Sequence, residues 1–181
     1  MAPTRKEIIL GVTGSIAAYK ACDITRQLKA AGFSVTVVLT KEAGYFITAL
    51  SLQTLSANKV YTDMFEIPFD WQLQHICLAE KARLILIAPA TANIIAKLST
   101  GICDDLLTAT VLAAKAPVLI CPAMDENMYE NRITQDNIAK LKKYGYKFIG
   151  PIKGKLASGK VGLGHLAKVE EIVGEVKRFL K

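Results

Sequence analysis

Short apolar runs alternate with segments of helical periodicity along this chain. Unbroken apolar or β-branched runs are typical of strands that are buried on both faces, and such runs occur at residues 7–12, 34–39, 82–88 and 117–121. A shorter run at residues 147–150 predicts a further strand. Because helical segments separate these runs, we expect the strands to pair in parallel.

The segments between the strands carry apolar residues at helical spacing. This pattern predicts helices at residues 15–31, 42–55, 127–144 and 169–181, and one that begins at about residue 92. Residues 56–74 show no clear periodicity. The alternation predicts a doubly wound, Rossmann-like α/β fold, with a parallel sheet covered on both faces and one domain over residues 1–181.

Parallel sheets of this kind bind ligands outside the carboxyl ends of their strands, so the strand-to-helix junctions are informative. At the first junction, residues 11–20, Gly14 permits close backbone approach and Ser15 offers a hydroxyl, which favours a phosphate at the helix start. The spacing is neither GxGxxG nor a P-loop, which weighs against ordinary NAD binding and ATP hydrolysis. A tight turn that needs glycine only for its backbone is the structural alternative.

The second and third junctions also follow apolar strands. Residues 88–93 supply small and hydroxyl side chains that can pack against a flat ring system and donate hydrogen bonds. Residues 122–129 place two methionines around a polar cluster. Helix capping by Thr91 and by Asp125 is the structural alternative at these two junctions.

The two histidines differ in what they suggest. His75 is the best general-base candidate because imidazole titrates near neutral pH, although a lone histidine is more often structural. His165 follows the glycine-containing stretch 154–164, which is long for a simple connection and predicts a flap. No cysteine or carboxylate stands at ligand spacing from either histidine, and no GxSxG turn occurs, so neither a metal site nor a serine hydrolase is predicted.

Composition narrows the class of protein. The chain has 181 residues, 51% hydrophobic and 22% charged, and no apolar run reaches the roughly 18 residues of a membrane helix. The absence of a cleavage signature near the N-terminus predicts a cytoplasmic location. The net charge of +7 is scattered without interleaved aromatic residues, which suits phosphorylated small molecules better than nucleic acid. The four cysteines lack CxxC spacing and are expected to be buried thiols.

Four ordered segments carry a resemblance to a known family. They are GVTGSIAAYK at residues 11–20, HICL at 75–78, IAPATANIIAKLSTGICDDLLT at 87–108 and PAMDENMYEN at 122–131. Together they closely resemble the homo-oligomeric flavin-containing cysteine decarboxylases, most of all the phosphopantothenoylcysteine decarboxylases of coenzyme A biosynthesis. The resemblance covers nearly the whole chain.

This resemblance implies an FMN site between subunits, with the phosphate near the first junction. The residues that it implies for cofactor binding are Gly14, Ser15, Ile16, Thr40, Ala90 and Thr91. Those that it implies for substrate binding are Ala123, Met124, Asp125, Asn127 and Met128. The implied catalytic residues are His75, Asp125 and Ser158, the last within a substrate flap at residues 154–165.

The implied reaction is the FMN-dependent decarboxylation of 4′-phosphopantothenoylcysteine to 4′-phosphopantetheine. Loss of CO₂ from a cysteinyl carboxylate leaves a carbanion without an electron sink, so in this family the flavin first oxidises the Cβ–S unit to a thioaldehyde. The expected partners are the phosphorylated substrate, further copies in a trimer or dodecamer, and a phosphopantothenoylcysteine synthetase domain or protein. Neither nucleic acid nor a membrane is expected as a partner.

Two residues depart from the family pattern. Asp125 stands where the family has asparagine, and a carboxylate that faces a substrate carboxylate is repulsive unless it is protonated or paired. In this family, loss of CO₂ leaves an enethiolate, and the reduced flavin returns its two electrons to give the saturated thiol. Ser158 aligns with the family cysteine that donates a proton in this reductive step, and an alcohol is a weaker acid than a thiol. The alternatives are a decarboxylase of another cysteinyl substrate, such as a peptide C-terminus, a non-catalytic regulatory flavoprotein, and a flavin prenyltransferase.

Overall fold

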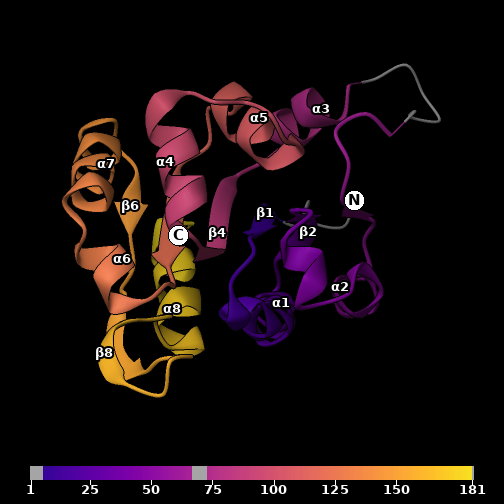
Figure 1. Ribbon diagram of the computed structural model, residues 1–181. Helices are drawn as coiled ribbons and strands as arrows, with labels where there is room; N and C mark the ends of the chain where they lie inside the picture. Colours follow the sequence, from indigo (N-terminus) through magenta and orange to yellow (C-terminus); the bar gives the residue numbers. More distant parts are fainter. Residues whose placement is uncertain (1–5, 67–72, 181) are drawn as a thin grey trace.

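The computed structural model describes residues 6–66 and 73–180, and it shows a parallel sheet between two layers of helices (Figure 1). Within these residues the sheet has six strands in the order β3-β2-β1-β4-β5-β6, and all neighbours pair in parallel. The strands are β1 Glu7–Val12, β2 Ser34–Leu39, β3 Val60–Tyr61, β4 Leu84–Ala90, β5 Val118–Pro122 and β6 Lys147–Phe148. The predicted doubly wound α/β fold is confirmed.

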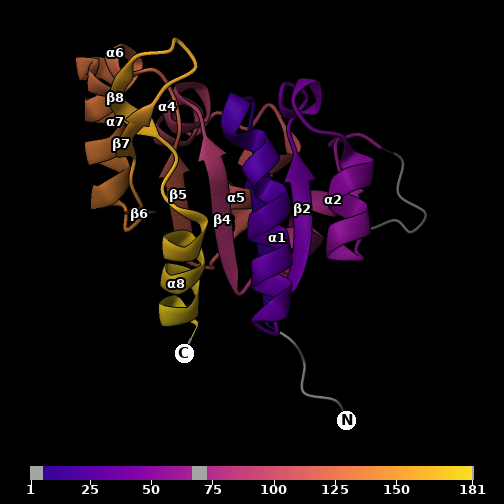
Figure 2. The same ribbon diagram turned by 90° about the horizontal axis from the view of Figure 1, so that it is seen from below.

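Helices cover both faces of the sheet (Figure 2). One face carries α1 (Ala21–Ala30), α2 (Ala49–Ser56) and α8 (Val169–Phe179). The other face carries α3 (Gln74–Lys81), α4 (Ala92–Thr100), α5 (Leu106–Ala113) and α7 (Arg132–Lys143). None of the helices in the described part of the chain combines the length and the apolar character that crossing a bilayer requires.

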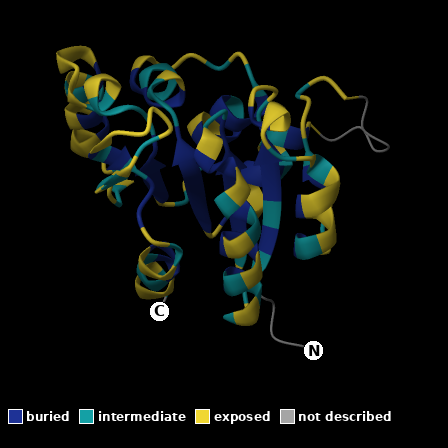
Figure 3. Cartoon of the chain, turned by 60° about the horizontal axis from the view of Figure 1, so that its bottom comes forward, coloured by how far each residue is buried: buried dark blue, intermediate teal, exposed yellow. Residues whose placement is uncertain are grey.

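The strands divide their side chains between two apolar cores. Ile8 and Leu10 of β1 pack with Leu28 of α1 in one core, whereas Ile9 packs with Ile95 of α4 in the other. All five side chains are fully buried, and the strands form the buried centre of the molecule in Figure 3. Burial of each such side chain contributes about 1.5–3 kcal/mol, so these contacts hold the sheet between its two layers of helices.

The winding of the chain reverses between β1 and β4. β1 pairs with β2 on one side and with β4 on the other, although the sequence between Val12 and Leu84 visits β2 and β3 first. At such a switch point the connections leave to opposite faces of the sheet and open a crevice at the carboxyl ends of the strands. The first and second junctions lie at this crevice.

Several shorter elements surround this edge of the sheet. They are the 3-10 helices η1 (Ile16–Lys20) and η2 (Ala43–Tyr45), the helix α6 (Glu126–Glu130), and the antiparallel strands β7 (Ile152–Lys155) and β8 (Val161–His165). The stretch 154–165, predicted as a flap, is therefore most of a β-hairpin.

The extents of three predicted helices were wrong. The segment 15–31 divides into η1 and α1, and the segment 42–55 divides into η2 and α2, whose first turn is capped by Thr48. The segment 127–144 divides at Asn131, whose side chain accepts a hydrogen bond of 2.9 Å from the Ile133 amide. Apolar spacing continues across each break, so the periodicity did not show the caps that interrupt it. The elements α3, α5 and β3 were not predicted.

Candidate active site

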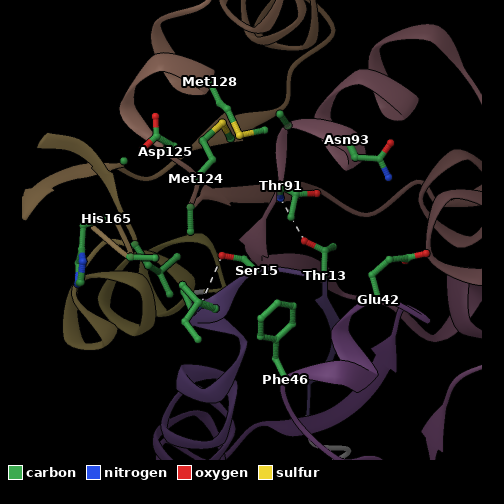
Figure 4. Close-up of a pocket in the computed structure, with 18 of the residues that line it drawn as sticks. Thr13, Ser15, Glu42, Phe46, Thr91, Asn93, Met124, Asp125, Met128 and His165 are labelled. Atoms are coloured by element: carbon green, nitrogen blue, oxygen red, sulfur yellow. Dashed lines mark hydrogen bonds between the residues drawn. The ribbon is translucent and has the colours of Figure 1, made fainter. Parts of the chain in front are cut away.

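A cavity of about 880 Å³ lies at the carboxyl ends of β1, β4 and β5 (Figure 4). Its volume is in the range of small-molecule and cofactor sites. The lining comes from residues within the segments 13–20, 40–46, 91–94, 123–128 and 155–166, together with Asp105. All three junctions and the β7–β8 hairpin therefore contribute to one cavity.

The first junction forms the floor of the cavity. Ser15 precedes η1, and its hydroxyl accepts a hydrogen bond of 3.3 Å from the Ala17 amide. A Cβ atom at Gly14 would lie 2.5 Å from the Cβ of Glu42, so the chain after β2 packs directly on the Gly14 backbone. Glycine is therefore required here by close approach as well as by the turn itself.

Thr13 joins the first junction to the second. Its Oγ1 donates a hydrogen bond of 2.8 Å to the Pro89 carbonyl and accepts one of 3.1 Å from the Thr91 amide. The second of these bonds is drawn in Figure 4, and Thr13 is only 2% exposed. A buried hydroxyl that is satisfied in both directions fixes the ends of β1 and β4 relative to each other.

The second junction combines capping with a place in the cavity. The Thr91 side chain caps α4 by accepting a hydrogen bond of 3.3 Å from the Ile94 amide, so the predicted capping role of Thr91 is confirmed. Thr91 and Asn93 also line the cavity. The register between β4 and β5 shifts between Ile87 and Ala90, so β4 is irregular where it reaches the cavity.

The third junction forms the opposite wall. Asp125 caps α6, because its Oδ1 accepts a hydrogen bond of 3.0 Å from the Asn127 amide. Met124 and Met128 project from the same junction, and both line the cavity (Figure 4). The wall therefore presents two polarisable thioethers and one carboxylate.

The β7–β8 hairpin closes one side of the cavity. Its turn is held by a hydrogen bond of 2.8 Å from the Leu156 amide to the Lys160 carbonyl, and Ser158 lies within this turn. On β8, His165 Nε2 lies 2.9 Å from Lys20 Nζ, and His165 Nδ1 lies 3.2 Å from the Lys155 carbonyl. A lysine ammonium only donates, so His165 accepts at Nε2 and carries its proton on Nδ1.

Most residues predicted for the site meet in this cavity. The predicted residues that line the cavity are Gly14, Ser15, Ile16, Thr40, Thr91, Ala123, Met124, Asp125, Met128 and Ser158. Their individual roles stay predictions.

Three predicted residues lie outside the lining. Ala90 is fully buried as the last residue of β4, and its carbonyl accepts a hydrogen bond of 3.0 Å from the Ala123 amide. Asn127 is exposed on α6, and its amide serves the Asp125 cap. His75 is half-buried on α3, which packs beside α5. One chain alone therefore does not bring His75 to the cavity.

Several lining residues were not predicted from the sequence. Glu42 and Phe46 come from the segment after β2, and Lys20 of η1 contacts His165 of β8. Thr13 stood in the motif of the first junction but was not singled out. A hydroxyl that directly follows a buried strand, one residue before the glycine turn, was the available signal for Thr13.

Charge near the cavity is partly neutralised by ion pairs. Lys97 Nζ lies 2.7 Å from Asp104 Oδ1 and 3.0 Å from Asp105 Oδ2, and Asp105 also lines the cavity. The hydrogen bond from Lys97 holds the pKa of Asp104 below its usual value.

Burial raises the pKa of the Cys121 thiol well above its ordinary value, so this thiol is a weak acid within the apolar core. Among the described residues, no group of three or more His, Cys, Asp or Glu side chains is arranged to hold a metal ion.

Comparisons with known proteins agree with the resemblance seen in the sequence. The chain is 48% identical over 168 residues to the coenzyme A biosynthesis bifunctional protein CoaBC of Bacillus subtilis. The matched stretch covers 93% of this chain and 41% of that protein. It is 46% identical over 177 residues to the "Probable phosphopantothenoylcysteine decarboxylase" of Streptococcus mutans. This match covers 97% of the chain and 99% of that protein. The chain thus spans about two fifths of the bifunctional relative.

Solved structures show the same fold. A mutant PPC decarboxylase in complex with pantothenoylaminoethenethiol superposes with a TM-score of 0.88 at 32% identity, covering 97% of this chain and 98% of that one. The FMN-dependent cysteine decarboxylase SpaF superposes with a TM-score of 0.84 at 28% identity, covering 97% and 98%. The family model described as Flavoprotein matches residues 2–181. The chain belongs to the Flavoprotein family.

Proposed function

We propose that this protein binds FMN and decarboxylates 4′-phosphopantothenoylcysteine to 4′-phosphopantetheine in coenzyme A biosynthesis. The observation that carries the proposal is that all three junctions line one cavity at the β1/β4 switch point. The relatives named for this reaction support it, because one of them is matched along 99% of its length. We propose a cytoplasmic location, and a phosphopantothenoylcysteine synthetase domain or protein as the source of the substrate.

The cavity fits FMN on its own geometry. The close packing at Gly14 leaves a side-chain-free backbone next to Ser15, where a phosphate can approach main-chain N–H groups. Thr40 and Thr91 offer hydroxyls beside it, and Phe46 offers an apolar surface for a ring. When bound, FMN supplies the two-electron acceptor that thiol oxidation requires before CO₂ can leave.

The residues of the third junction and the hairpin would hold the substrate. Met124 and Met128 supply an apolar wall, and Asp125 supplies a polar group next to it. Lys20 places positive charge and hydrogen-bond donors beside the hairpin, which suits a phosphorylated, carboxylated ligand, and His165 orients the Lys20 ammonium by accepting one of its hydrogen bonds. The hairpin turn with Ser158 would limit the access of water to the bound substrate.

For Asp125, replacement by asparagine should retain substrate affinity near neutral pH, while replacement by alanine should weaken it. Asparagine is an equally good cap for α6 and removes the repulsion between two carboxylates, whereas alanine loses the cap and the polar group together. We expect the Michaelis constant of the alanine variant to rise by roughly fivefold to tenfold, the equivalent of one lost hydrogen bond. An asparagine variant as impaired as the alanine variant would mean that the carboxylate itself is required.

For Ser158, replacement by cysteine should raise the share of saturated product. Formation of the saturated thiol would take a proton and the two electrons stored on the reduced flavin, and a thiol, with a pKa of about 8.5 in model compounds, is a better proton donor to the enethiolate than an alcohol. The cysteines of the described chain are not among the cavity-lining residues, so they do not replace it there. Mass spectrometry of anaerobic turnover distinguishes the products, which differ by two hydrogens. Wild-type protein that already gives only saturated thiol would show that another group, such as His165 or water, donates the proton.

We propose that copies of the chain associate as a trimer or a trimer-based dodecamer. Large apolar side chains are exposed near His75. Leu73, directly before α3, is 63% exposed, and Leu112 of the neighbouring α5 is 61% exposed. Ile16 and Tyr19 are exposed at the cavity rim. Association would cover these side chains and allow α3 of one copy to bring His75 to the cavity of another.

Light scattering at micromolar concentration tests the assembly. We expect the mass of three chains or a multiple of three, because a site that needs His75 from a second copy is incomplete in a monomer. An FMN-bound monomer would remove both the assembly and the shared site.

Turnover with defined substrates tests the function. FMN-loaded protein is incubated without oxygen with 4′-phosphopantothenoylcysteine or with a peptide that ends in cysteine, and products are identified by mass spectrometry. We expect loss of CO₂ from the phosphorylated substrate. Turnover of the peptide alone would assign the protein to a different cysteinyl substrate, and turnover of neither would support a non-catalytic flavoprotein.

A further inference from the structure

The β7–β8 hairpin is joined to the start of α6 by two hydrogen bonds. Glu126 Oε1 accepts a bond of 2.7 Å from the Leu163 amide. The Met124 amide donates a bond of 3.1 Å to the Gly164 carbonyl. These bonds link neighbouring residues of β8 to the third junction, and both ribbon views show β8 beside α6 (Figures 1 and 2).

The Glu126 carboxylate fits closely against the hairpin. A Cβ atom at Gly162 would lie 2.7 Å from the carboxylate carbon and from one of its oxygens, so only glycine leaves room for this contact. The side chain is half-buried and its carboxylate accepts from the hairpin main chain. A hydrogen bond to a charged acceptor is stronger than one between neutral groups.

Glu126 itself lies outside the cavity, but the hairpin that it contacts does not. Ser158, Gly164 and His165 all line the cavity, and Lys20 holds the hairpin from the other side through His165. Asp125, directly before Glu126, lines the opposite wall. The contact between Glu126 and Leu163 is therefore one of the contacts that fix the distance between the hairpin turn and the substrate wall.

We propose that Glu126 is a positioning residue for the decarboxylation, whose carboxylate docks the β7–β8 hairpin over bound substrate. The inference rests on the proposed function. Glu126 acts through the Leu163 amide and does not touch the reacting atoms. Its loss should weaken substrate binding and leave FMN binding unchanged, because the residues fitted to FMN lie on other segments.

A purely local role in α6 makes a different prediction. Glu126 occupies the first turn of a five-residue helix, where a negative charge is favourable. Glutamine removes the charge but keeps an oxygen that can accept from Leu163, whereas aspartate keeps the charge but is one methylene too short. The two variants therefore separate docking from helix electrostatics.

Hydrogen exchange and steady-state kinetics on the FMN-loaded protein test the proposal with Glu126→Ala, Glu126→Gln and Glu126→Asp. Glu130→Ala is the matched control, because Glu130 is exposed at the other end of α6. In the alanine and aspartate variants, we expect amide exchange in the peptide 156–163 and the Michaelis constant to rise by about tenfold, with a much smaller change in kcat. The glutamine variant should fall between the wild type and the alanine variant, because it keeps the acceptor oxygen but loses the charge. The Glu130 variant should resemble the wild type.

Two outcomes would overturn the proposal. One is unchanged exchange in the hairpin of the alanine and aspartate variants, and the other is a glutamine variant as impaired as alanine. Should the alanine variant fail to fold, the comparison of aspartate with glutamine decides alone. Hydrogen exchange needs no turnover, so it still decides whether Glu126 docks the hairpin if the wild-type protein is inactive on 4′-phosphopantothenoylcysteine, a result that would contradict the proposed function alone.

Discussion

Replacing Gly14 by alanine should give a folded protein that has lost most of its affinity for FMN. The added methyl group would lie 2.5 Å from the Cβ of Glu42 and 3.2 Å from its carbonyl carbon, so one of the two segments at the proposed phosphate site must move. Overpacking of this kind costs about 1–3 kcal/mol, which corresponds to roughly a fivefold to 150-fold weaker binding if the bound state bears it. Fluorescence titration with FMN measures the change.

Gly44→Ala is the matched control for this result. Gly44 lies in η2 near the same cavity edge, but a Cβ at this position meets nothing within 4 Å. The control should bind FMN as the wild type does, which separates the contact at Gly14 from a general effect of losing a glycine. Equal affinity in the Gly14 variant and the wild type would place FMN elsewhere.

Replacing His75 by asparagine should strongly slow substrate-dependent reduction of the flavin while leaving FMN bound. Asparagine approximates the shape and hydrogen bonding of histidine, but it cannot take a proton near neutral pH. Loss of a general base typically lowers the rate by 10²–10⁴-fold, so bleaching of the flavin absorbance should become about that much slower. Bleaching at the wild-type rate would mean that His75 is structural.

Mixed assemblies show whether His75 acts in its own chain or in another. A Gly14→Ala chain has an intact His75 but an impaired cavity, and a His75→Asn chain has the reverse. If the site is shared between copies, co-assembly of the two should restore part of the activity that each lacks alone. No recovery in verified mixed assemblies would show that both residues serve the same chain's site.

The pattern of the sequence predicted the parts of the fold that depend on burial. The strand runs 34–39 and 117–121 are apolar because both faces of the sheet are covered, and the structure places strands at both. The helix α5 was not predicted from the sequence, for a related reason. It is buried around most of its circumference, with Leu107 and Thr110 both inside, so it lacks the polar face that marks a surface helix.

The candidate site was predicted where it follows from strand ends and missed where it depends on distant contacts. Gly14, Thr91 and Asp125 each follow a buried strand, so the carboxyl edge of a parallel sheet brings them together. The pair of Lys20 and His165 joins residues 145 positions apart, and no local pattern predicts it. His75 was singled out by its chemistry and the resemblance, but its distance from the cavity of its own chain is visible only in three dimensions.

The most direct test of the account is the release of labelled CO₂ from 4′-phosphopantothenoylcysteine that carries ¹³C in its cysteinyl carboxylate. The experiment compares FMN-loaded wild-type protein with Gly14→Ala and Gly44→Ala protein at one limiting FMN concentration, without oxygen. We expect the wild type and the Gly44 control to release ¹³CO₂ and the Gly14 variant to release it in proportion to its residual FMN occupancy. Absence of ¹³CO₂ from the FMN-loaded wild type, or equal release by a flavin-free Gly14 variant, would contradict the claim that this cavity is the site of a flavin-dependent decarboxylation.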